Sequence, residues 1–511
     1  MIIYFETVKN NKKKILKWLL YTITLILLIG IIVIFKAHVL NEPLSDNSYY
    51  GWVSQEMIKG KIPYIDIFAY NPPGIFYICY LFIWLFGPSA QTFVWIGIFA
   101  ATLSLIVIYL FCLNNYNYYI ALIASTIFII TSSDKYTLTD QTTVEVYVNL
   151  FILAAILFLS FYIKKESGIM LFFSGLTLGL STLFKTNAML IILGFLLFLI
   201  LFKYKSIKAR TSYKNIILTY SIFISSIAIP WLIFFTIYLF FGGLKEVLSS
   251  IFIFPMGYPG GLDKILLIFP YAKCLVGTFT VWSIGIVYAI FLIFIKKNWL
   301  QKIFIIYLLF SIVTIVILGR YYPHHYSLIL PACLLLTADM FHNLYKKLNK
   351  TRILKLAFIF LLIFALFPIT YIQIKNYILL SPEEISLSKH PIFVQNDYAM
   401  NVGLKLKQLT KKNDTVYNFT PDSSVLYYAQ RSSATKYVID TIIYMGSEDW
   451  EEKLKNDIAK DIIKNKPKAI IISIVYASPE NRFKQLFEII NTKYSEWFDY
   501  GTFKVYKIKD N

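Results

Sequence analysis

Charged residues are scarce in this sequence. Asp, Glu, Lys and Arg make up 15% of its 511 residues, and hydrophobic residues make up 58%. A soluble globular chain is about 25% charged and about 45–50% apolar. The shortage of charge therefore excludes an ordinary soluble enzyme, a disordered scaffold and a coiled coil. Apolar runs of membrane-spanning length recur from residue 15 onward, which indicates a polytopic membrane protein.

Cysteine is also rare, and a cleavable signal pattern is missing. The four cysteines all lie in apolar segments, which argues against a disulfide framework or a Cys-based zinc site. The first apolar run, Ile15–Phe35, is long enough to span a bilayer and lacks a small-residue cleavage site. It therefore predicts a retained helix. There is no internal repeat and no low-complexity linker.

Acidic residues are outnumbered: 29 Asp and Glu stand against 49 Lys and Arg, a formal charge of +20. The basic residues gather in the N-terminal arm and in four loops, at 164–165, 203–214, 296–302 and 346–355. Cytoplasmic loops of membrane proteins carry such an excess, so the N-terminus is predicted to be cytoplasmic. Because these loops account for much of the charge, no nucleic-acid partner is expected.

Threading the apolar runs puts every one of these basic loops on the inner face. The same threading puts several segments on the outer face: 37–73, 132–143, the turn around residue 185, 242–262, 320–325 and everything after 377. About eleven crossings result, with a range of 11 to 13 helices, because the apolar piece that starts at Gly74 is shorter than a bilayer requires.

The composition changes after residue 377. Residues 1–377 are predicted to form the transmembrane domain, and residues 378–511 are polar with mixed charge. Strand-like runs alternate in this tail with helix-like stretches, which predicts a small extracytoplasmic α/β domain. The expected strands are Thr415–Phe419, Tyr437–Ile439, Ala469–Val475 and Thr502–Ile508, and the expected helices are Trp450–Lys464 and Ser478–Asn491.

The first outer loop, 37–73, combines a carboxylate with aromatic residues. Residues 47–59 are compatible with an amphipathic helix along the membrane interface, with Asp46 as its N-cap. Pro72-Pro73-Gly74 then breaks the chain before it re-enters the bilayer. Two readings stay open for this loop: an aromatic interfacial anchor with a capping Asp, or a functional site.

Three further outer segments carry charges where an apolar chain has few. Asp140 and Glu145 either cap the next helix or form a functional pair on one face of the turn-to-helix junction. Lys185, the outer lysine that breaks the positive-inside pattern, either meets lipid headgroups or holds an anionic ligand. The cluster Arg320–Tyr326 contains two of the five histidines and is either an interfacial belt or part of a ligand site.

These segments all reach one side of the membrane in the predicted topology. Carboxylates suit a general base, and Lys and Arg suit a phosphate leaving group. A transporter is expected to carry its charges near the midplane of broken helices. The combination fits transfer from a lipid-phosphate donor better than it fits ion transport.

Four groups of motifs, taken in order along nearly the whole chain, resemble the GT-C glycosyltransferases, in the branch of the protein O-mannosyltransferases and the lipid A aminoarabinose transferase. The motifs are Asp46 with Tyr49-Tyr50, Gly60–Asp66 and Asn71–Gly74; Gly175–Leu180 leading to Phe184-Lys185; His325–Pro331; and the tail motifs Asp414–Tyr417, Tyr427–Arg431 and Asn465–Ile472. The resemblance implies a GT-C-like fold.

The resemblance also implies an activity: a sugar moves from a polyprenyl-phosphate-linked donor to a glycan, lipid or protein acceptor on the outer face of the cell membrane, with inversion. It makes Asp46 the general base. The other residues that it implies are Lys185, Arg320 and His325 for the donor phosphate; Asp140 and Glu145 for the acceptor or a cation; and Tyr49, Tyr50, Tyr70, His324 and Tyr326 for substrate. A divalent cation stays open as a cofactor.

The sequence departs from the family at two places. Asn71 precedes the Pro pair where the aminoarabinose transferase has a charged residue, and no large domain is inserted between helices as in the eukaryotic O-mannosyltransferases. The sequence identifies neither the sugar that is transferred nor the acceptor that receives it. Two alternatives stay open: a lipid-linked glycan flippase or transporter, and an O-antigen-type ligase or polymerase.

Overall fold

The structure, a computed structural model, describes most of the chain. The described residues are 2–37, 44, 47–208, 213–257, 266, 268–319, 321–348, 351–381, 384, 395–420, 422–438, 448–473 and 483–509. Two of the residues that the sequence singled out, Asp46 and Arg320, lie outside these ranges.

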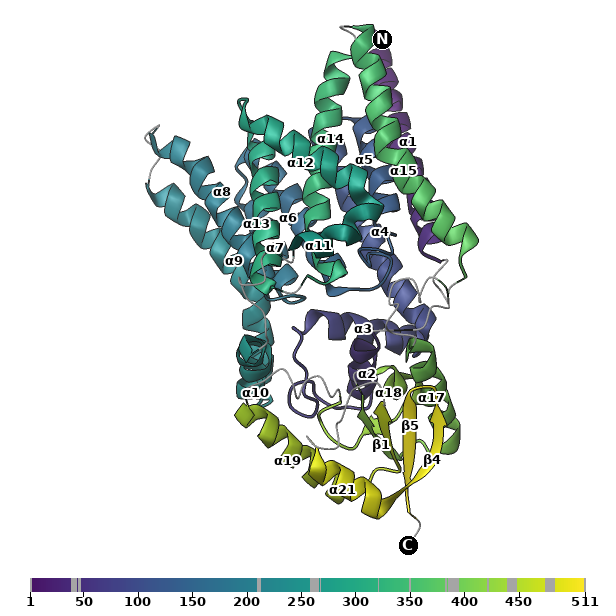
Figure 1. Ribbon diagram of the computed structural model, residues 1–511. Helices are drawn as coiled ribbons and strands as arrows, with labels where there is room; N and C mark the ends of the chain where they lie inside the picture. Colours follow the sequence, from purple (N-terminus) through teal and green to yellow (C-terminus); the bar gives the residue numbers. More distant parts are fainter. Residues whose placement is uncertain are drawn as a thin grey trace. The chain divides into compact units, whose positions relative to one another are not determined.

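Long apolar helices make up most of the described chain (Figure 1). Eight of them are long and apolar enough to cross a membrane, and four more are apolar but shorter. The helices up to residue 379 are α1 Ile2–Ala37, α2 Asn47–Ile58, α3 Gly74–Phe86, α4 Ala90–Asn115, α5 Tyr118–Thr131, α6 Val144–Lys165, α7 Gly168–Thr182, α8 Ala188–Lys208, α9 Tyr213–Phe240, α10 Leu244–Leu248, α11 Ile268–Tyr271, α12 Phe279–Ile293, α13 Trp299–Leu318, α14 Leu330–Lys347 and α15 Arg352–Leu379. The prediction of a helical polytopic membrane protein is confirmed.

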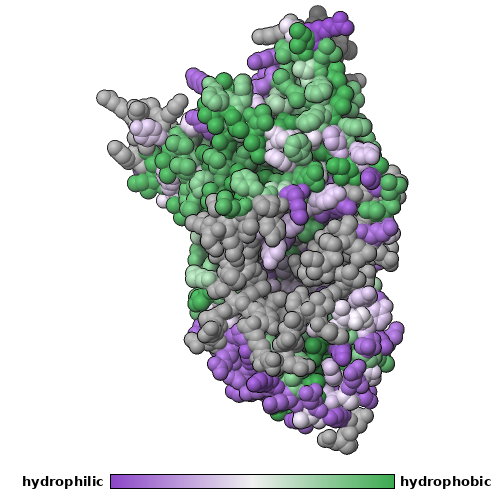
Figure 2. All heavy atoms as spheres, viewed as in Figure 1, coloured by the Kyte–Doolittle hydropathy of each residue, from purple (hydrophilic) through white to green (hydrophobic). Residues whose placement is uncertain are grey.

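Short 3-10 and π-helical segments connect some of these helices: η1 Ser249–Ile253, η2 Phe254–Gly257, η4 Ala272–Thr278 and η5 Pro323–Ile329. The apolar piece after Gly74 is a separate helix of 13 residues, α3. Hydrophobic side chains cover the visible faces of α12 and α15, whereas hydrophilic side chains gather over the later helix α19 (Glu448–Asn465) (Figure 2). Helices with apolar outer faces are those that lipid can surround.

The described contacts divide the chain into two compact units. The first contains residues 1–39, 97–230 and 261–380, and the second contains 40–96, 231–260 and 381–511. The division that the sequence predicted, at residue 377, stays a prediction.

In the first unit, two glycines let helices approach closely. A Cβ on Gly175 would lie 2.0 Å from Ser226 Oγ, and one on Gly179 would lie 2.3 Å from the Ile227 carbonyl oxygen. Small residues allow such backbone contact between membrane helices, where a larger side chain would hold the helices apart. The glycines therefore explain how α7 packs against α9.

The second unit holds a five-stranded mixed sheet. Its strand order is β2-β1-β3-β5-β4; β2, β1 and β3 run parallel, and β5 and β4 are antiparallel. The strands are β1 Thr415–Phe419, β2 Ser432–Ser433, β3 Ala469–Ser473, β4 Tyr494–Tyr500 and β5 Phe503–Ile508, and the helices are α17 Gln395–Leu409, α18 Ser424–Ala429, α19 Glu448–Asn465 and α21 Lys484–Lys493. All five residues of β3 are buried, as in a strand covered on both faces.

The expected strand at Tyr437–Ile439 is wrong in its described part. Thr435 Oγ1 donates a hydrogen bond to the Tyr437 carbonyl and accepts one from the Tyr437 backbone N–H. A threonine that bonds locally in this way takes the backbone groups that a strand partner would need. The strands expected at 415–419 and 502–508 and the helix expected at 450–464 are confirmed to within a few residues.

The helix expected at 47–59 is present as α2, but it is buried on more than the single stripe that was expected. Nine of its twelve residues are buried, including the polar side chains of Ser54, Gln55 and Glu56. Protein surrounds it because α3 packs on one side and α18 on another. Its polar residues therefore bond to protein instead of water.

Candidate functional site

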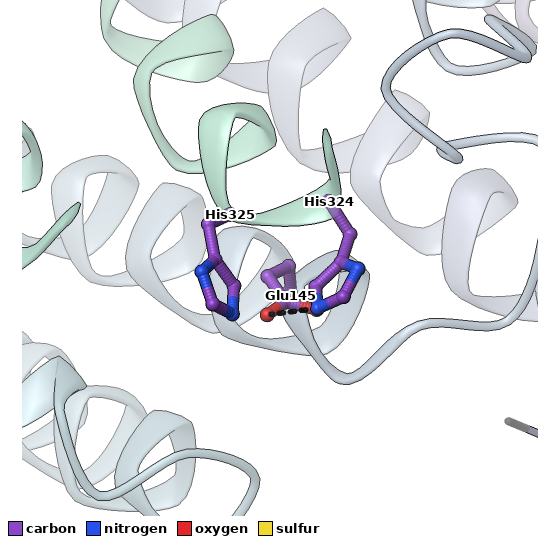
Figure 3. Close-up of side chains that lie close together, drawn as sticks. All are labelled: Glu145, His324 and His325. Atoms are coloured by element: carbon purple, nitrogen blue, oxygen red, sulfur yellow. Dashed lines mark ion pairs between the residues drawn. The ribbon is translucent and has the colours of Figure 1, made fainter. Parts of the chain in front are cut away.

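A carboxylate and two imidazoles meet in the first unit. Glu145 lies in the first turn of α6, and His324 and His325 are consecutive residues of η5. One ligand atom from each of the three lies within 4.8 Å of the others, and His324 Nε2 is 3.9 Å from Glu145 Oε1 (Figure 3). Among the described residues, this is the one group of three or more His, Cys, Asp or Glu side chains that could hold a metal ion.

Lys185 joins this cluster as the ion-pair partner of Glu145. The Lys185 ammonium donates to Glu145 Oε1, and the exposed fractions of the two side chains are 15% and 1%. A buried carboxylate is stable only when a cation and hydrogen bonds compensate for its lost hydration. The single negative charge of Glu145 therefore lies among three side chains that are, or can become, positive.

Neighbouring contacts on α6 hold these side chains together. The Asn149 side-chain amide donates a hydrogen bond of 3.0 Å to the Ser327 carbonyl of η5. Residues 145 and 149 share one face of a helix, so this contact presents η5 to Glu145. The rings of Tyr147 and Phe184 stack at 4.6 Å with 8° between their planes, which fixes the turn that carries Lys185.

The segment between α5 and α6, residues 132–143, is ordered by a buried lysine and a buried aspartate. Lys36, at the end of α1, donates to the carbonyls of Ser132 at 2.7 Å and Thr139 at 2.9 Å. Asp134 accepts bonds from the Thr137 backbone N–H and hydroxyl at 2.9 and 2.8 Å. Burial raises the pKa of Asp134 to about 6, although these hydrogen bonds oppose the shift.

Asp140 lies in this same segment, apart from the group of Glu145, His324 and His325. Its side chain is buried, and its charge contributes to the raised pKa of Asp134. The expectation that Asp140 and Glu145 act as a pair on acceptor or cation stays a prediction. Tyr326, expected to bind substrate, is buried and donates to the Ile268 carbonyl at 2.7 Å, so its described contact is with the protein itself.

Three tyrosines expected to bind substrate lie in the second unit. Tyr49 stacks on Tyr70 with ring centres 5.4 Å apart, and its hydroxyl donates to the Phe68 carbonyl at 3.0 Å. Tyr50 is half-buried and lies 6.0 Å from the ring of Phe76. Tyr49 is buried and its described contacts are with the protein, so substrate binding by these three tyrosines stays a prediction.

The group of Glu145, His324 and His325 has the donor set that zinc prefers. Zinc binds imidazole nitrogens and carboxylate oxygens, and catalytic sites often supply three protein ligands and leave a fourth position open. Glu145 Oε2 is buried and has no hydrogen-bond partner among the described residues, so one carboxylate oxygen is available to a cation. These three residues therefore could hold a divalent metal, in competition with Lys185 for Glu145.

The sequence found Glu145, Lys185, His324 and His325 but not their grouping. The resemblance implied an acceptor or cation role for Glu145 and a donor-phosphate role for Lys185, and both stay predictions; the structure adds that the two side chains are direct partners. It missed Asn149 and Lys36. Asn149 could have been noticed, since it is a polar residue inside an apolar helix and four positions after Glu145.

Comparisons with known proteins place these residues in context. Residues 70–234 match the family model described as dolichyl-phosphate-mannose-protein mannosyltransferase. No curated protein matches the chain.

Solved structures with a similar fold are remote in sequence. ArnT from Cupriavidus metallidurans, bound to undecaprenyl phosphate, is 10% identical, with a TM-score of 0.61 over 95% of this chain and 97% of that chain. The oligosaccharyltransferase AglB from Archaeoglobus fulgidus, in complex with an inhibitory peptide and a dolichol-phosphate, is 12% identical, with a TM-score of 0.54 over 94% of this chain and 74% of that chain. A complex of the Archaeoglobus fulgidus oligosaccharyltransferase with zinc and sulfate gives a TM-score of 0.54 at 12% identity, over 94% of this chain and 73% of that chain.

The solved structures confirm the ArnT-like fold. The family match confirms the resemblance to GT-C glycosyltransferases that the motifs indicated, and with it the enzyme class: a membrane glycosyltransferase that uses a polyprenyl-phosphate-linked sugar.

Proposed function

We propose that this membrane glycosyltransferase moves a sugar to an acceptor on the outer face of the membrane, with inversion and with Asp46 as general base. The N-terminus is cytoplasmic in this proposal, and the C-terminal α/β domain is extracytoplasmic. The distribution of Lys and Arg over the loops supports this orientation. The proposal includes 11 to 13 transmembrane helices; among the described residues, eight helices are long enough to span a membrane and four apolar helices are shorter.

The chemical step is a displacement at the anomeric carbon. The Asp46 carboxylate takes the proton of the acceptor hydroxyl, and the oxygen attacks the anomeric carbon. The bond from that carbon to the phosphate oxygen breaks, and its electron pair leaves with the polyprenyl phosphate. Cationic groups near the phosphate stabilise the charge that develops there, a role that Lys185, Arg320 and His325 take in this proposal.

The observation that carries the proposal is the cluster around Glu145. Lys185, His324 and His325 gather at one carboxylate, so the cluster offers more cationic donors than Glu145 neutralises. An added anion such as a phosphate compensates for this excess. ArnT and AglB, the structural relatives, were solved with undecaprenyl phosphate and dolichol-phosphate, which supports the same class of donor here.

The test is release of polyprenyl phosphate. Purified protein in detergent is incubated with candidate polyprenyl-phosphate sugars, and free polyprenyl phosphate is measured by mass spectrometry. Asp46→Asn should abolish release while folding and donor binding persist. Asp66→Asn is the matched control, because Asp66 is an exposed carboxylate of the same loop that accepts a hydrogen bond from the Ile62 backbone N–H.

Two outcomes would contradict the proposal. Full activity in a folded Asp46→Asn protein would refute the general-base assignment. Failure of the wild type to release polyprenyl phosphate from any donor that it binds, even after membrane extract is added as a source of acceptors, would favour a flippase or transporter.

A further inference from the structure

The residues on either side of Asp46 are anchored to a segment that follows almost 400 residues later. Leu44 is bonded through both backbone groups: its carbonyl accepts from the Ser424 hydroxyl at 2.8 Å, and its N–H donates to the Tyr428 hydroxyl at 3.3 Å. Ser48 shares a hydrogen bond of 2.8 Å with the Ser423 hydroxyl, 375 residues away. Anchors therefore stand two residues before and two residues after Asp46.

The same helix, α18, holds α2 further along. The Gln55 side-chain amide donates to the Tyr427 carbonyl at 3.1 Å, and the Trp52 indole donates to the Arg431 carbonyl at 3.0 Å. A Cβ on Gly51 would lie 2.6 Å from the ring of Tyr427, so the helices are in close contact here. Figure 1 shows α2 and α18 side by side.

Burial makes these hydrogen bonds strong constraints. Ser48 and Ser424 have no exposed surface, and Ser423 is 3% exposed. A buried polar group that loses its partner keeps the full cost of lost hydration, so the bonded arrangement excludes nearby alternatives. The opposite end of α18 is fixed as well, because the buried guanidinium of Arg431, two residues after the helix, donates to Thr410 and to the carbonyl of Lys407.

We infer that Ser423 and Ser424 are positioning residues for the reaction, because they hold Leu44 and Ser48, the described residues that flank Asp46 in the chain. This inference rests on the proposed function of Asp46. It gives a role to the Tyr427–Arg431 motif, which the reaction itself does not use. The C-terminal domain then sets the rate of the chemical step, in addition to any part in acceptor choice.

The first test separates the chemical step from donor binding. The double variant Ser423→Ala/Ser424→Ala should lower kcat by about 10- to 100-fold, because displacement of a catalytic group by about 1 Å costs about that much. The KM for the polyprenyl-phosphate sugar should not change. Ser473→Ala is the matched control: Ser473 is a buried serine of the same sheet domain, on β3, and its variant should keep both constants.

Asp46→Asn in the same assay tells the two ideas apart. An inactive Asp46→Asn with a normal kcat in the folded double serine variant would overturn the positioning role and leave the proposed function intact. Full activity of Asp46→Asn would refute the general-base assignment. It would also refute the positioning role, because that role depends on Asp46 as the general base.

A cross-link gives a second test that does not depend on loss of a hydroxyl. The variant Ser48→Cys/Ser423→Cys should form a disulfide under mild oxidation, since the two hydroxyl oxygens are 2.8 Å apart. The cross-linked protein should keep its activity, because the inference requires the contact during turnover. Activity that is lost on cross-linking and restored by reduction would overturn it.

Discussion

Asn149 of α6 and Ser327 of η5, 178 residues apart, are joined by a hydrogen bond of 3.0 Å from the Asn149 amide to the Ser327 carbonyl. This contact lies one helical turn beyond Glu145 and two residues beyond His325. It ties the carboxylate and the imidazoles to one another through the backbone. The cluster is therefore a product of helix packing and not of a local motif.

Loss of this contact should loosen the cluster. Asn149→Ala is expected to weaken zinc binding by about 10-fold, because groups that orient metal ligands contribute about 10- to 100-fold to affinity. Isothermal titration with zinc measures the change. Thr177→Ala, which removes a hydroxyl that bonds within α7, is the control and should bind zinc like the wild type. Equal affinity in both variants would contradict the role of Asn149.

Zinc should bind at Glu145, His324 and His325. His325→Ala and Glu145→Gln are expected to lower zinc affinity more than 10-fold, whereas His342→Ala, which removes a buried imidazole outside the group, should not. Affinity should fall at acidic pH, since metal binding requires neutral imidazoles. Lys185→Met should raise affinity, because Lys185 competes for Glu145. Metal analysis and titration check each result, and zinc retained by His325→Ala would contradict the assignment.

Lys185 is expected to act on both stability and donor use. Lys185→Ala leaves a buried carboxylate without its cation, which costs about 3–5 kcal/mol of stability. It should also raise the donor KM by about 10- to 100-fold, since a hydrogen bond to a charged group contributes about 1.5–3 kcal/mol. The double variant Glu145→Gln/Lys185→Met should recover the unfolding temperature but not the KM. If the donor KM of the double variant returned to the wild-type value together with the unfolding temperature, Lys185 would have a structural role only.

Asp134 should make stability depend on pH. Burial raises its pKa from 3.8 to about 6, so the folded protein holds a proton there between those values that the unfolded chain releases. The stabilisation is fully present below about pH 4 and is lost as the pH rises through 6, a change of up to about 3 kcal/mol. Asp134→Asn should remove this slope in thermal unfolding, and the exposed Asp66→Asn should keep it. A slope that survives in Asp134→Asn would assign it to another group.

Gly179 should tolerate no larger side chain. The Cβ of Gly179→Val would lie 2.3 Å from the Ile227 carbonyl oxygen, which is too close for a normal contact. Overpacking of this kind lowers the free energy of unfolding by about 1–3 kcal/mol. Gly30→Ala is the matched control, because a Cβ there meets nothing within 4 Å. Only the first should lower the unfolding temperature in detergent. A similar loss in both variants would point to helix dynamics in place of packing.

The transmembrane helices could be predicted from the sequence because their cause is local. A bilayer requires about 20 apolar residues for each span, and runs of consecutive residues such as Ala90–Asn115 and Val144–Lys165 meet this requirement. The strands β1 and β5 were also found from their own residues. The strand expected at 437–439 failed because the Thr435 side chain takes the backbone groups of Tyr437, a bond that periodicity does not register.

The sequence alone determined that the chain is a helical membrane protein and which residues carry unusual charge. Only the tertiary structure decided which of those charges meet. Lys185 pairs with Glu145, and α2 is buried against α18. Partners that are 40 or 372 residues apart are chosen by how helices pack. Packing depends on the shapes of the helices and on a hydrogen-bond partner for every buried polar group. These partners come from distant parts of the chain, so no single segment of sequence specifies them.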